Sequence, residues 1–167
     1  MKSYIDGHNK NLIGHDNKNT LECNCTRSVC PLPLEKNPPN NCRQNDIIYQ
    51  GEIKKNETES IKTYKGCTSD QFKNRVSVHR NTFNDTNKKN NTEMAKAVHA
   101  LVESGHSYTI KWKIIDKTSS YRPGDKFCKL CNLEKYHILF KKENTDVNTF
   151  RLEKCRHKRK QHLGAIT

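Results

Sequence analysis

Residues 47–66 read IIYQGEIKKNETESIKTYKG, and this stretch decides the fold. Its beginning, residues 47–53, is rich in β-branched and aromatic side chains, which favour a strand. Residues 60–64 alternate apolar and polar side chains, as a half-buried strand does. The polar link between the two runs, residues 54–59, is short, so we expect an antiparallel hairpin. Gly66 is expected to end the second strand.

The patterns downstream predict three helices and a third strand. Residues 68–71, Thr-Ser-Asp-Gln, have the capping-box pattern of a hydroxyl followed three residues later by Gln, which predicts the start of the first helix. A second helix is expected between Thr92 and Gly105. Residues 108–114 alternate cleanly and predict a strand, and Cys128 opens the last helix. This order predicts an α+β domain with a small, antiparallel-containing, three-stranded sheet flanked by helices.

Length and composition bound the organisation of the chain. Its 167 residues, 32% of them hydrophobic, allow one modest core with small appendages. We expect a disordered leader over residues 1–22, a cysteine-rich segment with a zinc-knuckle character over 23–45, the α+β domain over 46–152, and a basic tail over 153–167.

The charge points to a polyanionic partner. There are 31 Lys and Arg against 18 Asp and Glu, a net charge of +13, and nucleic acid is the commonest polyanion. No apolar run approaches the roughly 18 residues of a membrane span, so we expect no membrane partner. The first residues have no apolar core of a signal peptide. The expected location is therefore nuclear or otherwise intracellular and not secreted, and thiols stay reduced there.

The eight cysteines are therefore read as metal ligands before disulfides. Close cysteine pairs chelate zinc because one loop offers two sulfur atoms. One structural Zn²⁺ site is predicted from Cys23, Cys25, Cys30 and Cys42. A second combines Cys128, Cys131, Cys155 and His157. For Cys128 and Cys131, ordinary half-buried thiols or a redox pair stay open as alternatives, and Cys67 is expected to pack.

Six polar residues offer the groups that phosphodiester hydrolysis needs. Tyr49 and Tyr64 lie on the two strands of the hairpin, and Arg75 and His79 are four residues apart, on one face of a helix. A carboxylate such as Glu134 can bind Mg²⁺. A guanidinium clamps phosphate, and a phenol or an imidazole moves a proton. The remaining member is the amide of Asn148. Taken singly, each of these residues is more often an ordinary core or surface residue.

These residues, in this order, resemble the GIY-YIG nuclease family. The resemblance rests on Ile48-Tyr49, Tyr64-Lys65-Gly66, Arg75-x-x-x-His79, Glu134 and Asn148. It is closer to one branch, the endonuclease domain at the C-terminus of Penelope-like retroelements. That likeness rests on Cys23-Asn24-Cys25, Cys30-Pro31-Leu32, Cys42, Tyr108-x-Ile110-x-Trp112, Cys128-x-Leu130-Cys131-x-x-Glu134-Lys135 and Cys155-Arg156-His157, and it covers about residues 21–160.

The resemblance implies a DNA endonuclease and a role for each residue. Tyr49 would orient or activate water, and Tyr64 is a candidate base. Arg75 would contact the scissile phosphate. His79 would be an accessory base or a phosphate ligand. The nicked DNA would then prime reverse transcription in a retroelement, with a reverse transcriptase domain in the same polyprotein as the partner.

The resemblance also implies a single divalent metal, Mg²⁺ or Mn²⁺, held by Glu134. Asn148 would order the site. Glu93 is a rival acidic residue, ranked lower because a helix N-terminus favours Glu for electrostatic reasons alone.

Two positions depart from the family pattern. Ile47 stands where the first motif has Gly, and Lys65 stands where the second motif has Ile. Lys65 is expected either to be harmless or to touch DNA. These departures motivate the alternative function, a catalytically inactive, zinc-stabilised nucleic-acid-binding module. A disulfide-bonded secreted domain is the third alternative, and the missing signal peptide counts against it.

Overall fold

A computed structural model describes residues 30, 32, 42–58, 60–125, 127–141, 144 and 146–148 of the chain. The helices and strands follow in the order β1 Ile47–Lys55, β2 Ile61–Thr68, α2 Phe72–Phe83, a short 3₁₀ helix η1 Thr86–Lys88, α3 Glu93–Glu103, β3 Tyr108–Lys117 and α4 Lys129–Leu139. Within these residues, no helix combines the length and the apolar character that crossing a membrane requires.

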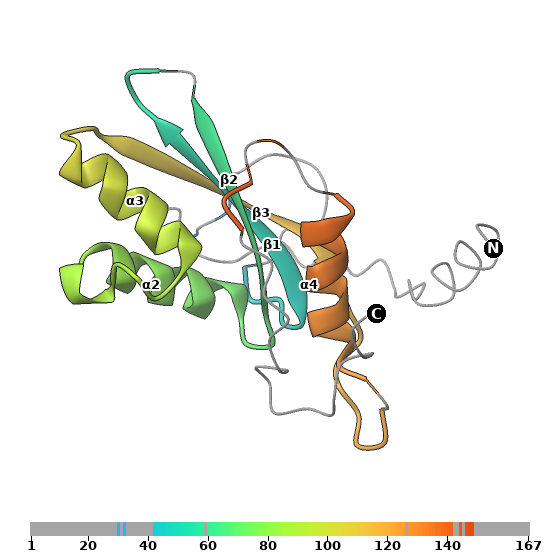
Figure 1. The fold of residues 1–167 in the computed structure, drawn as a ribbon. Coiled ribbons are helices and arrows are strands. Elements are labelled where there is room, and N and C mark those ends of the chain that lie inside the picture. The colour runs from blue at the N-terminus through green and yellow to red at the C-terminus, as the bar shows by residue number, and fades with distance from the viewer. Residues whose placement is uncertain are drawn as a thin grey trace.

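The three strands form one antiparallel sheet in the order β2-β1-β3 (Figure 1). Tyr49 in the central strand lies opposite Gly66 of β2 and Ile114 of β3. This arrangement confirms the predicted α+β class, the predicted hairpin and the predicted third strand. The hairpin turn is shorter than expected because β1 continues through Lys55.

Helices cover both faces of the sheet, α2 and α3 on one side and α4 on the other (Figure 1). Successive side chains of a strand point to opposite faces, so neighbours in β1 enter different clusters. Tyr49 packs with Phe72 of α2 and Trp112 of β3, whereas Ile48 packs with Leu130 and other residues of α4. The two clusters hold the sheet between two layers of helix.

Gly66 does not end β2, which is a correction to the prediction. The strand runs on to Thr68, and Gly66 pairs with Tyr49 in the register. A Cβ at Gly66 would lie 2.6 Å from the Tyr49 hydroxyl and 3.0 Å from a ring carbon of Tyr64. Glycine is needed here because a tyrosine approaches the strand closely, not because the chain turns.

The predicted capping box at residues 68–71 is also wrong. Thr68 belongs to β2, where it pairs with Ile47, and α2 begins only at Phe72 without a side-chain cap. The first N–H groups of α2 are satisfied by backbone instead. Phe72 donates to the carbonyl of Gln44 at 2.9 Å, and Lys73 donates to the carbonyl of Cys42 at 2.8 Å. Strand pairing therefore outcompetes the local capping signal.

The start of α3 confirms its prediction. The hydroxyl of Thr92 accepts a hydrogen bond from the N–H of Ala95 at 3.0 Å, and Gly105 follows the helix with a φ of 76°. A Ser or Thr cap at the start and a left-handed glycine after the end are the usual boundaries of a helix.

Candidate active site

A hydrogen-bonded cluster joins β1 to α2. The hydroxyl of Tyr49 lies 2.8 Å from Nε2 of His79 and accepts a hydrogen bond from Nε of Arg75 at 3.0 Å. Arg75 and His79 are one helical turn apart, so both face the central strand. The spacing in the sequence predicted that shared face, and the structure adds the phenol that both residues contact.

The protonation states in this cluster follow from burial. Tyr49 is fully buried, and burial together with the neighbouring Tyr64 raises its pKa well above the usual range, although Arg75 opposes the rise. Burial, and then the charge of Arg75, lower the pKa of His79 from 6.5 to about 3. At neutral pH the phenol therefore stays protonated and donates a hydrogen bond to the neutral imidazole. Its oxygen at the same time accepts a hydrogen bond from Arg75.

This assignment predicts a specific loss of stability in acid. In the unfolded chain His79 takes up a proton near pH 6.5, whereas in the folded chain it does so only near pH 3. Its contribution to the free energy of unfolding is therefore fully present above pH 6.5 and is lost as the pH falls towards 3. Urea midpoints measured between pH 4 and 7 should fall more steeply for the parent than for His79→Gln. Equal slopes for the two proteins would contradict the assignment.

Tyr64 completes the aromatic side of the site. Its ring centroid lies 6.3 Å from that of Tyr49 and 5.6 Å from that of His79, edge-on to the imidazole. Only 5% of Tyr64 is exposed. The two tyrosines of the hairpin are therefore brought together, as their neighbouring strands predicted.

The outer edge of β2 holds the two residues predicted farther along the chain. The N–H of Cys67 donates to Oε1 of Glu134 at 3.1 Å. Two residues earlier, the backbone of Lys65 makes two bonds with Asn148: its N–H donates to Oδ1 at 2.6 Å, and its carbonyl accepts from Nδ2 at 2.7 Å. Alternate residues of an edge strand direct their backbone groups outwards. Glu134 and Asn148 therefore occupy successive positions on one edge.

Cys67 packs against the apolar cluster beneath α4. A hydrogen bond with Cys131, burial, and the nearby carboxylate of Glu134 raise the pKa of the Cys67 thiol well above its usual range. The thiol therefore stays protonated at neutral pH and adds no negative charge near the Glu134 carboxylate.

Exposure separates the residues that can meet a substrate from those that cannot. Tyr49 and His79 are 0% and 1% exposed, whereas Arg75 and Glu134 are both partly exposed. A guanidinium and a carboxylate at the surface can bind a phosphate and a divalent cation. The buried phenol accepts from Nε of Arg75 and so holds the guanidinium from the inside, and the imidazole in turn contacts the phenol.

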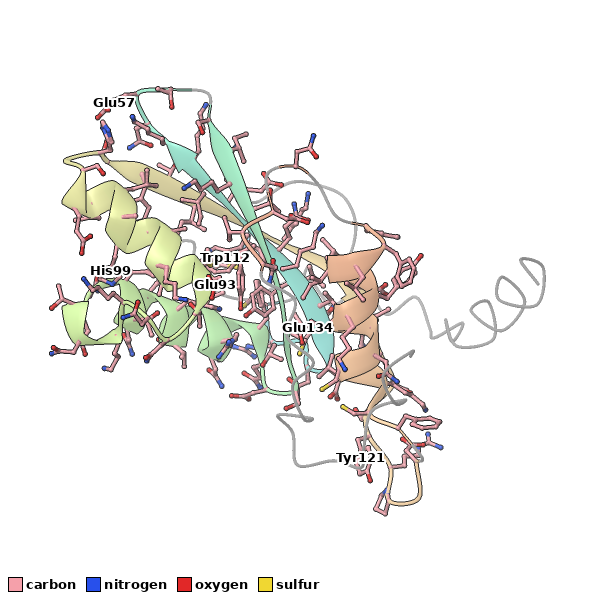
Figure 2. The ribbon with its side chains drawn as sticks, viewed as in Figure 1. Glu57, Glu93, His99, Trp112, Tyr121 and Glu134 are labelled. Carbon is pink, nitrogen blue, oxygen red and sulfur yellow. The ribbon has the colours of Figure 1, made fainter. Side chains whose placement is uncertain are left out.

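The two acidic candidates lie in different places (Figure 2). Glu134 lies beside β2, on α4, whereas Glu93 lies in the first turn of α3 and forms an ion pair with Lys96 at 2.9 Å. Mg²⁺ keeps several waters and is often held by one or two carboxylates together with substrate phosphates. A single carboxylate beside β2 is therefore compatible with a magnesium ion that takes its other ligands from water and phosphate.

The predicted zinc ligands are only partly described. Cys23, Cys25, Cys155 and His157 lie outside the described residues. Cys42 is buried in the cluster with Tyr49, and Cys30 packs against that cluster. Cys128 and Cys131 are buried in the other cluster, beneath α4. No disulfide joins the described cysteines, and the described part of the chain holds no group of three or more His, Cys, Asp or Glu side chains placed to bind a metal.

Three residues of this site were not predicted from the sequence as parts of it. Cys67 was expected only to pack, and Lys65 and Asp146 were given no joint role, yet Lys65 and Asp146 form a buried ion pair at 2.8 Å. A lysine in the middle of an otherwise buried strand was the available signal, because such a residue needs a partner of opposite charge. The partner's identity could not be read from it, since the two residues are 81 positions apart.

Comparison with known proteins adds no assignment. No family model matches the chain, and neither a curated protein nor a solved structure matches it. The geometry of these residues therefore carries the functional conclusion.

Proposed function

We propose that this chain is a metal-dependent DNA endonuclease of the GIY-YIG type, related to the endonuclease domains of Penelope-like retroelements. The observation that carries the proposal is the hydrogen-bonded cluster of Tyr49, Arg75 and His79 beside the strand edge that holds Glu134 and Asn148. Residues as far apart in the sequence as Tyr49 and Asn148, which are 99 positions apart, thus meet at the paired strands β1 and β2. Its partly exposed guanidinium and carboxylate are the groups that could meet a phosphate and a cation.

The roles follow from exposure and charge. Arg75 stays positively charged, and its Nε is committed to Tyr49, so its terminal nitrogens are the part that can hold a phosphate. Tyr49 and His79 keep that guanidinium in one orientation. Tyr64 stays the proposed base for the attacking water, because 5% of this residue is exposed, more than of Tyr49 or His79.

Glu134 would hold the divalent cation. When bound, Mg²⁺ would polarise the phosphoryl oxygen and stabilise the leaving oxygen. One oxygen of Glu134 accepts from the Cys67 N–H, which orients the carboxylate on its helix. Asn148 orders the same edge by binding both backbone groups of Lys65.

Nicking of supercoiled plasmid by the purified chain tests the proposal. With Mg²⁺ we expect relaxed circles, and with EDTA in place of Mg²⁺ we expect none. Since the net charge is +13, DNA binding should also weaken steeply as salt rises. A folded protein that binds DNA in this salt-sensitive way but never relaxes it would contradict the nuclease. That result would favour a nucleic-acid-binding module.

A further inference from the structure

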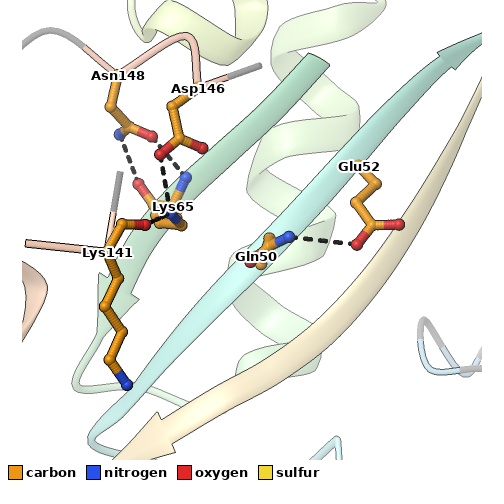
Figure 3. Close-up of polar contacts among 6 residues, drawn as sticks. All are labelled: Gln50, Glu52, Lys65, Lys141, Asp146 and Asn148. Carbon is orange, nitrogen blue, oxygen red and sulfur yellow. Dashed lines mark hydrogen bonds and ion pairs between the residues drawn. The ribbon is translucent and has the colours of Figure 1, made fainter. Parts of the chain in front are cut away.

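The stretch 146–148, which follows α4, closes the outer edge of β2 (Figure 3). Asp146 forms a parallel bridge with Thr63, and the N–H of Val147 donates to the Thr63 carbonyl at 2.8 Å. Asn148 then binds both backbone groups of Lys65. These bonds satisfy backbone groups of Thr63 and Lys65, in the part of the edge that precedes Cys67. Cys67 is the residue that contacts Glu134.

The side chain of Lys65 is buried against this stretch. Its Nζ lies 2.8 Å from Oδ2 of Asp146 and also donates to the carbonyl of Lys141 (Figure 3). The side chains of Lys65 and Asp146 are only 3% and 2% exposed. An ammonium removed from water to this degree is retained only when it is paired and hydrogen-bonded. Lys65 therefore cannot reach DNA from this position, which removes one of its two expected roles.

The bond from Lys65 to the Lys141 carbonyl also attaches the end of α4 to β2. Lys141 directly follows Phe140, the C-cap residue after α4. A single ammonium on β2 thus binds both the chain leaving α4 and the stretch at 146. Besides the bond of Glu134 to Cys67, the contacts that hold α4 on the sheet include the apolar cluster with Ile48 near its start and the pair formed by His137 and Asp116 of β3 at 2.9 Å.

Glu134 lies on α4 between these attachments. The apolar cluster lies on its N-terminal side, and the Lys65 attachment lies on its C-terminal side. Its carboxylate meets the N–H of Cys67, two residues beyond Lys65 on the same strand. The position of α4 along β2 therefore decides whether the carboxylate meets that N–H.

We infer that Lys65 is a positioning residue: its bonds to Asp146 and to the Lys141 carbonyl fix the end of α4 against β2, and so hold the Glu134 carboxylate on the Cys67 N–H. The structural part of this inference stands on the contacts alone. Its catalytic consequence, correct placement of a metal ligand, rests on the proposed nuclease function.

Amide hydrogen exchange at Cys67, followed by NMR, tests the inference without requiring activity. Lys65→Met keeps the length of the side chain and removes the charge, but it leaves Asp146 buried without its cation and can unfold the protein. Lys65→Met/Asp146→Leu removes both charges, a replacement that buried ion pairs often tolerate. Exchange at Cys67 should become at least about tenfold faster in the double variant.

Two further variants make the test decisive. Asp146→Asn keeps the size of the partner and removes its charge, so it should speed exchange at Cys67 in the same direction. Lys113→Met removes a lysine that pairs with Glu52 on the same face of the sheet, where both side chains are partly exposed, and it should leave Cys67 unchanged. Parent-like exchange at Cys67 in any folded variant of the Lys65–Asp146 pair would overturn the inference.

Magnesium dependence of nicking provides the catalytic readout. If Lys65 positions a metal ligand, the folded double variant should need about 10-fold more Mg²⁺ for half-maximal nicking, as loss of a supporting contact around a metal site typically causes. An unchanged magnesium requirement would limit Lys65 to a structural role and overturn the catalytic part. If the parent protein does not nick at all, the proposed function fails, and the exchange measurement still decides the structural part.

Discussion

Replacing Glu134 with Gln is expected to reduce plasmid nicking by at least about 100-fold, the size typical of losing one group that stabilises a developing charge, which here is the cation that Glu134 would hold. The amide keeps an oxygen that can accept from the Cys67 N–H, so the attachment of α4 to β2 should survive. What disappears is the negative charge that would bind the cation. Nicking rates over a range of Mg²⁺ concentrations should show activity that added metal does not restore to the parent level.

Glu93→Gln is the matched control for this prediction. Glu93 is also a helix glutamate, but it pairs with Lys96 at the surface of α3. Loss of such an exposed pair should change stability by less than about 1 kcal/mol. Nicking by Glu93→Gln should stay at the parent rate. The reverse pattern, with Glu93→Gln inactive and Glu134→Gln active, would mean that the metal ligand has been assigned to the wrong helix.

Replacing Arg75 with Lys should be almost as damaging, although the charge is kept. Lysine cannot donate to Tyr49 and present a fork to a phosphate at the same time. We expect nicking to fall by about 100-fold or more. The Tyr49 hydroxyl would also lose its donor in a buried setting, which should cost about 1–3 kcal/mol of unfolding free energy. Circular dichroism and urea melts separate this cost from the loss of rate.

A double-mutant cycle with Tyr49→Phe tests whether Arg75 and Tyr49 act as one unit. The phenol is buried, so under the proposed function it can act only through Arg75. Tyr49→Phe should therefore slow nicking by itself and add little once Arg75 is lysine. If the rate losses of the two single variants simply multiply in the double variant, Tyr49 acts independently of Arg75. Arg80→Lys serves as the control, since Arg80 is exposed on the same helix.

The local patterns predicted most of the secondary structure. Alternation in residues 60–64 and 108–114 and the β-branched start at Ile47 marked the three strands. The Thr92 cap and Gly105 marked the limits of α3. These signals succeed because each depends on near neighbours: the twofold repeat of a strand, or a hydroxyl reaching an N–H three residues on.

The same local reasoning failed where tertiary contacts competed with it. The capping pattern at Thr68 lost to strand pairing with Ile47, and Gly66 continued its strand because Tyr49 occupies the space of its missing side chain. In the candidate site, too, local spacing predicted some features and tertiary contacts decided others. The spacing of Arg75 and His79 predicted their shared face, whereas their common partner Tyr49 depends on which strand lies beneath α2.

The sequence by itself determined the α+β class, the hairpin, and the residues whose chemistry suits phosphodiester hydrolysis, because composition, periodicity and short spacings are written in consecutive residues. Only the tertiary structure decided that Tyr49 and His79 are buried behind Arg75, that Glu134 meets Cys67, and that Lys65 is paired with Asp146. These facts depend on burial and on contacts between residues tens of positions apart. Such contacts exist only once the chain has closed on itself, and that closure also sets the pKa values of the groups it brings together.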